Sequence, residues 1–80
     1  MERIRTLVRR RKWTLVNVVG GTQNAEKYKE QIVWCQNQFA EDKFVTRSDP
    51  RDQNRTAKFV FKEGKDALMF ALVWNGSVKT

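Results

Sequence analysis

A strict alternation of side chains over residues 57–62 constrains the fold of this chain more than any other feature. One face of the extended segment carries Ala57, Phe59 and Phe61, and the other carries Lys58, Val60 and Lys62. A period of two predicts a strand with one face buried. The following run, residues 67–74, is apolar throughout and ends at an Asn-Gly pair. Acidic residues just before it are typical of the first turn of a helix, so we expect a strand followed directly by a helix.

Three further elements are predicted upstream. They are a strand over residues 13–19, a helix over residues 25–40 and a short strand over residues 44–47. The first strand is rich in β-branched and aromatic residues and stops at two glycines. The helix rests on a stripe with spacings of three and four, made of Ala25, Tyr28, Ile32, Cys35 and Phe39. Thr22 or Asn24 is expected to cap it.

These elements follow the order β-α-β-β-α and predict an α+β fold. Residues 48–56 are polar and form a solvated loop, so the strands on either side of it make a hairpin. The simplest packing is a two-layer sandwich, in which both helices cover one face of a three-stranded sheet. This arrangement resembles a truncated ferredoxin-like fold without its last strand. Residues 13–76 form the single domain, and residues 77–80 are interpreted as a tail too short to count on as a strand.

The basic charge of the chain is concentrated at its start. Residues 1–12 hold six of the 16 Lys and Arg residues and one of the nine Asp and Glu residues. The remainder shares ten basic and eight acidic residues. Because the neighbouring cations repel one another, we expect residues 1–12 to form a flexible or partly extended basic arm. Ile4, Leu7 and Val8 argue against complete disorder, and they either prolong the next strand or dock on a neighbour.

A basic arm on a nearly neutral domain predicts a polyanionic or acidic partner. Lys and Arg that neutralise phosphates release counterions, which gives salt-sensitive attraction to nucleic acid without sequence preference. Nucleic acid, DNA or RNA, is therefore the leading partner. An acidic protein surface is the alternative, and a solubilising tail without a specific partner is the third interpretation. The side chains predicted to hold phosphates are Arg3, Arg5, Arg9, Arg10, Arg11 and Lys12.

The uncovered face of the sheet is a second candidate for nucleic-acid contact. Lys58 and Lys62 are expected to point outward there. Val16 and Val18 are expected to point inward, which places Trp13 and Leu15 outward beside these lysines. A Trp among cations is suited to stacking a base while the cations hold phosphate. The alternative is that Trp13 covers the edge of the sheet, and the chain has no RNP-type aromatic motif.

Two features predict a protein interface instead. Trp34 is expected on the polar face of its helix, opposite the apolar stripe, where a large aromatic residue is typical of an interface anchor. The alternative is that the loop or the arm covers it. The second helix is apolar all round, which predicts a homodimer or another partner as an alternative to simple core burial. The residues concerned are Leu68, Met69, Leu72 and Val73.

Several functions are disfavoured by composition. The chain has no His and one Cys, so neither His-based catalysis nor a zinc site with Cys ligands is expected. Cys35 lies in a helix stripe and is interpreted as a buried, inert thiol. We therefore expect no enzyme activity, cofactor, metal or small-molecule substrate. The longest apolar run has eight residues, far below the ~20 that span a bilayer. With no signal peptide recognised, a cytoplasmic protein is expected.

The segment FKEGKDALMFALVWNG, together with WCQNQF, resembles small uncharacterised proteins of tailed bacteriophages. In those proteins an F-x-F strand runs into K-D-A-x-x-F-x-L-x-W. The matching residues are Phe59, Phe61, Lys65, Asp66, Ala67, Phe70, Leu72 and Trp74. The resemblance covers at most residues 13–76 and implies a phage accessory or virion protein acting in the host cytoplasm. It implies no activity and no functional site.

Two functional hypotheses follow from these observations. The leading one is a small non-enzymatic binding module that contacts nucleic acid through its arm and the uncovered face of the sheet. The alternative is a phage-encoded protein-interaction module, either an inhibitor of a host enzyme or a minor virion component. That module would use Trp34, the second helix or an unpaired sheet edge.

Overall fold

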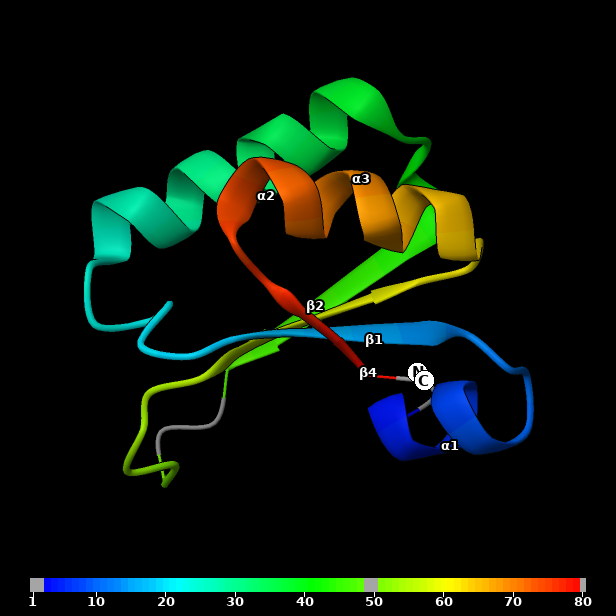
Figure 1. Cartoon of the computed structure of the whole chain (residues 1–80), viewed down its shortest axis with the longest axis horizontal. Helices are drawn as coiled ribbons and strands as arrows, with labels where there is room; N and C mark the ends of the chain where they lie inside the picture. Colours follow the sequence, from blue (N-terminus) through cyan, green and yellow to red (C-terminus); the bar gives the residue numbers. More distant parts are fainter. Residues whose placement is uncertain (1–2, 49–50, 80) are drawn as a thin grey trace.

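The sheet has four antiparallel strands in the order β2-β3-β1-β4. A computed structural model describes residues 3–48 and 51–79. The strands are β1 (Thr14–Val18), β2 (Phe44–Ser48), β3 (Ala57–Phe61) and β4 (Ser77–Lys79). The helices are α1 (Ile4–Arg9), α2 (Ala25–Gln38) and α3 (Gly64–Trp74), with a 3-10 turn η1 (Glu41–Lys43) before β2. Helices α2 and α3 lie on one side of the sheet and α1 lies on the other (Figure 1).

The prediction of a three-stranded sheet is wrong, because the last residues pair with β1. Asn75 adopts a left-handed conformation with φ of 57°, and the N–H groups of Asn75 and Gly76 both donate to the carbonyl of Ala71. This turn brings the chain back beside β1. A Cβ on Gly76 would lie 2.5 Å from Cγ1 of Val16, so only glycine passes there without displacement. From β1 onward the chain therefore has the complete β-α-β-β-α-β order of the split βαβ arrangement.

The prediction of two helices is also wrong, because part of the expected flexible arm is the helix α1. Ile4, Leu7 and Val8 have the spacing of one helical face, and Leu7 is buried. Lys12 takes a left-handed φ of 61°, and the N–H of Trp13 donates to the carbonyl of Leu7 at 3.0 Å. These two features fold the helix back against the sheet instead of leaving it extended.

The main core lies between the sheet and the α2–α3 layer. Phe59 and Phe61 are fully buried there and pack against Phe70, with ring centroids 4.5 and 5.3 Å apart. Val16 belongs to the same buried cluster, and Val18 packs against it. The predicted inward directions of these residues are therefore confirmed. We call this side of the sheet the helix-covered face.

Helix α2 begins at the predicted position. The Asn24 side chain accepts hydrogen bonds from the N–H groups of Glu26 and Lys27, at 3.1 and 3.2 Å, which caps the helix. Cys35 is fully buried in the core, and burial raises the pKa of its thiol to about 12. The prediction that this thiol is buried is confirmed. At neutral pH it is protonated and a poor nucleophile.

Trp34 does not stand on an isolated polar face. Its ring lies 5.8 Å from Phe39, 6.0 Å from Phe70 and 6.4 Å from Trp74, centroid to centroid. These ring contacts come from α3 and from Phe39, the residue just after α2. The prediction assumed that α2 packs only against the sheet. In the structure α2 also packs against α3, through Trp34.

Candidate nucleic-acid interface

Helix α1 covers part of the sheet face that the sequence left open. Val60 points away from the α2–α3 core but is fully buried, and α1 contacts its strand β3. Leu7 of α1 is 5% exposed. Burying such aliphatic side chains contributes about 1.5–3 kcal/mol each. The contact therefore fixes α1, together with its arginines, against the sheet.

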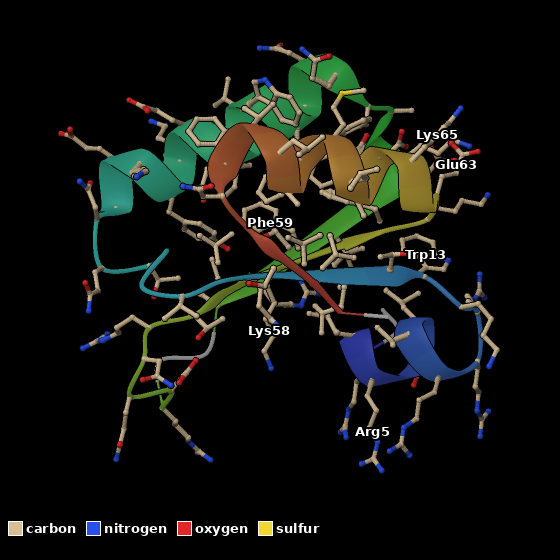
Figure 2. All side chains as sticks on the ribbon, viewed as in Figure 1. Arg5, Trp13, Lys58, Phe59, Glu63 and Lys65 are labelled. Carbon is tan, nitrogen blue, oxygen red and sulfur yellow. The ribbon has the colours of Figure 1, made fainter. Side chains whose placement is uncertain are left out.

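A groove of about 510 Å³ lies between α1 and the sheet. Its apolar lining comes from Ile4, Val8 and Leu15, and its polar lining comes from Arg5, Arg9, Arg47, Ser48 and Lys58. Within residues 3–48 and 51–79, this lining holds four cations and no acid. We call this side of the molecule the basic face. Figure 2 shows Lys58 and Phe59 on opposite sides of the sheet, with Lys58 on the side of α1.

Like charges are placed together on the basic face. Arg47 of β2 is directly opposite Lys58 of β3 in the strand register, an arrangement that destabilises a sheet. Arg5 and Arg9 are four residues apart on α1, where like charges destabilise a helix by a few tenths of a kcal/mol. The repulsion within each pair does not add to the stability of the fold. All four cations line one groove, where an anionic ligand would be attracted to each of them.

Asp52 approaches the basic face from the loop before β3. Asp52 accepts hydrogen bonds from the N–H groups of Asn54 and Thr56, at 3.0 and 3.1 Å. These bonds lower the pKa of Asp52, and the positive charge of Lys58 lowers it further. The carboxylate is thus engaged by its own loop. It reduces the local positive potential only in part.

The fold brings only some of the predicted phosphate-binding residues together. Arg5, Arg9 and Lys58 are brought together in the groove. Arg10 joins Arg5 and Arg9 around a smaller hollow of about 390 Å³ on α1. The others predicted to hold phosphate lie outside the groove lining and are exposed, namely Arg3, Arg11, Lys12 and Lys62.

Trp13 is half-buried and does not line the groove. It lies just before β1, beyond the end of α1 (Figure 2). Because Val60 is covered by α1, the sheet face beside it is not an open stacking platform like that of aromatic-bearing RNA-binding sheets. A stacking role for Trp13 stays a prediction.

The second helix exposes the residues that the sequence proposed for a protein interface. Leu68, Met69, Leu72 and Val73 are all exposed on α3. Trp34 is partly buried, and with Trp74 it lines a second groove of about 560 Å³ between α2 and α3. This groove lies in the α2–α3 layer, on the opposite side of the sheet from α1 (Figure 1).

Sequence reasoning missed Arg47 and Ser48 as groove residues. Arg47 lies on a predicted strand, and the alternation of β2 places it on the same face as Lys58. Extending the period of two through the hairpin would therefore have found it. Ser48 reaches the groove at the end of β2, for which the sequence holds no comparable pattern.

Residues 3–48 and 51–79 contain no group of three or more His, Cys, Asp or Glu side chains placed to hold a metal ion. In the same residues, no helix has both the length and the apolar character needed to cross a bilayer.

Comparison with other proteins finds no family model, curated protein or solved structure that matches this chain. The resemblance to tailed-bacteriophage proteins therefore stays a prediction.

Proposed function

We propose that this protein is a small, non-enzymatic, cytoplasmic nucleic-acid-binding module that holds the phosphate backbone on its basic face. The observation that supports the proposal is the convergence of Arg5, Arg9, Arg47 and Lys58 on one groove. Arg and Lys bind phosphate by charge and by directed hydrogen bonds, and the guanidinium fork suits two phosphate oxygens at once. The apolar floor of the groove accommodates sugar and base edges.

A groove built on folded elements differs from a flexible arm because its cations are in place before the ligand binds. In the structure, cations come from a helix and from two strands, so their spacing is set before binding. A preformed site loses less entropy on binding than an arm that must first be ordered. Contacts with phosphate carry no sequence information, so the proposed binding is weakly dependent on sequence.

The test measures fluorescence anisotropy with a labelled single-stranded oligonucleotide and with its duplex, over a range of salt concentrations. Four phosphate contacts predict that affinity falls about 50- to 150-fold between about 50 and 200 mM salt. Arg9→Ala and Lys58→Ala should each weaken binding and lower the salt slope by about one contact. Deleting residues 1–11 is less informative, because it would also uncover Val60.

Lys27→Ala is the matched control, because it removes the same charge from an exposed position on α2, in the opposite layer. It should change affinity by less than about twofold, through long-range charge alone. Equal losses in Lys27→Ala and Lys58→Ala would contradict a defined site. Binding that does not depend on salt would contradict phosphate recognition and favour a protein partner.

A second candidate function is a protein-interaction module, as the phage resemblance would suggest for a host-enzyme inhibitor or a minor virion component. The observation that favours it is the exposed apolar side of α3. Exposed apolar groups gathered on one element often mark protein interfaces. This candidate uses the opposite layer from the basic face, so both functions are compatible in one molecule.

A further inference from the structure

Helix α3 presents an apolar side that no described part of this chain covers. Leu68 and Leu72 are spaced four apart, as are Met69 and Val73, so the four residues form one side of the helix. Their exposed fractions run from 45% for Met69 to 76% for Leu72. We call these four residues the α3 outer face.

The groove between α2 and α3 adds apolar surface to the same layer. Val33, Trp34 and Trp74 line it, and Val33 is itself 43% exposed. The charged part of its lining comes from α2 and consists of Glu26, Lys29 and Glu30. Two acids and one base thus border an apolar hollow next to the end of α3.

The α2–α3 layer differs from the basic face in its net charge. Helix α2 carries two acidic and two basic residues, and α3 carries one of each, so each helix is neutral as a whole. Because neither helix has a net positive charge, this side offers the phosphates of nucleic acid no net attraction. A second copy of the chain meets no net repulsion here, whereas two basic faces would repel each other.

The ends of the helices are complementary under a two-fold rotation. Figure 1 shows α2 and α3 running in opposite directions, so the start of α2 lies at the C-terminal end of α3, where two acids and one base, Glu26, Glu30 and Lys29, line the groove. Lys65 stands at the opposite end of α3 with its side chain 78% exposed. Its ammonium is 4.0 Å from Glu63, an exposed pair that contributes little. Antiparallel pairing of two α3 helices would bring Lys65 of each copy toward Glu26 and Glu30 of the other.

We propose that the α3 outer face binds a second copy of this chain, in a two-fold dimer with antiparallel α3 helices. Leu68, Leu72 and Val73 of both copies form the apolar centre, and Lys65 and Glu30 form charged pairs at the two ends. A two-fold interface uses the same patch on both subunits, which this distribution of charge satisfies. The dimer leaves both basic faces directed outward, on opposite sides of the assembly.

The experiment is sedimentation velocity without nucleic acid, from low micromolar to several hundred micromolar protein, so its result does not depend on the proposed function. The wild-type chain should pass from monomer to dimer and stop there. Leu72→Glu should remain monomeric throughout. Val19→Glu is the matched control, because Val19 is 74% exposed and lies in the turn after β1. It should dimerise like the wild type.

Charge reversal tests the antiparallel geometry. Lys65 and Glu30 are both exposed, so substituting them should leave the fold intact. Lys65→Glu and Glu30→Lys should each weaken dimerisation about tenfold, since each places like charges together twice in the dimer. The double variant should recover affinity to within about threefold of the wild type. A wild-type chain that stays monomeric, assembly that continues past the dimer, equal loss in Val19→Glu, or failure of the double variant to recover would each overturn the proposal.

Discussion

The two faces of the sheet are built from the same strands but use their side chains for different purposes. On the helix-covered face, Phe59 and Phe61 pack with Phe70 in an aromatic core. On the basic face, Val60 is buried where α1 contacts β3, and two residues away along β3 Lys58 lies opposite Arg47. One face therefore supplies most of the packing, and the other keeps charges that packing alone would disfavour. Substitutions on the helix-covered face are therefore expected to change mainly stability, and substitutions of cations on the basic face mainly binding.

The largest expected effect tests this separation by truncating two neighbours in β3. Phe59→Ala should destabilise the fold by about 3–5 kcal/mol, because it leaves a cavity beside Tyr28 and Phe70. Val60→Ala, under α1, should cost about 2 kcal/mol, because it removes two methyl groups. Urea denaturation followed by circular dichroism measures both. A larger loss in Val60→Ala would show that the basic face, and not the aromatic core, is the main source of stability.

The next effect concerns the point where the chain leaves α3 to form β4. Gly76→Ala should cost about 1–3 kcal/mol, since its Cβ would press on Val16 in the helix-covered core. Gly64→Ala is the control, because its nearest neighbour outside the helix would be Thr14 Oγ1 at 3.7 Å, an ordinary contact. It should be neutral or slightly stabilising in a helix. Thermal unfolding of the two variants makes the comparison, and equal melting temperatures would contradict the tight passage at Gly76.

The helix-covered face was largely predictable from the sequence, because period and burial agree there. The alternation at Phe59 and Phe61 and the helical stripe through Cys35 each indicate a face within one element. Trp34 was misplaced because two of its ring neighbours, Phe70 and Trp74, belong to α3, and the packing of two helices against each other is not visible in the pattern of either. β4 was missed because three residues become a strand only beside β1.

The basic face was predictable in composition but not in form. The excess of cations is evident in the sequence, but a six-residue helix is too short to be stable alone and depends on its docking against the sheet. Ile4, Leu7 and Val8 gave the right helical spacing, but repulsion among the neighbouring cations suggested an extended arm. The groove joins α1, β1, β2 and β3, so no linear motif describes it.

The smallest expected effect comes from Asp52, whose carboxylate lies near Lys58 of the basic face. Hydrogen bonds from the Asn54 and Thr56 N–H groups lower its pKa in the folded state, and Lys58 adds to the effect. A lowered folded-state pKa stabilises the protein above the unfolded value, near 4, and this contribution is lost as the pH falls through the folded-state value. Asp52→Asn should therefore reduce the loss of stability on acidification, as measured by urea denaturation at several acidic pH values.

The same substitution has a second expected result on the basic face. Removing one negative charge near Lys58 should raise affinity for an oligonucleotide at low salt by about two- to threefold, and the gain should fade as salt screens the charge. Because Asp52 is only partly buried, both changes are small, and Glu41→Gln on η1 serves as the control for charge removal. An unchanged acid dependence would mean that the loop hydrogen bonds do not hold the carboxylate. An affinity gain as large in Glu41→Gln would mean that net charge, and not the position of Asp52 beside the basic face, controls binding.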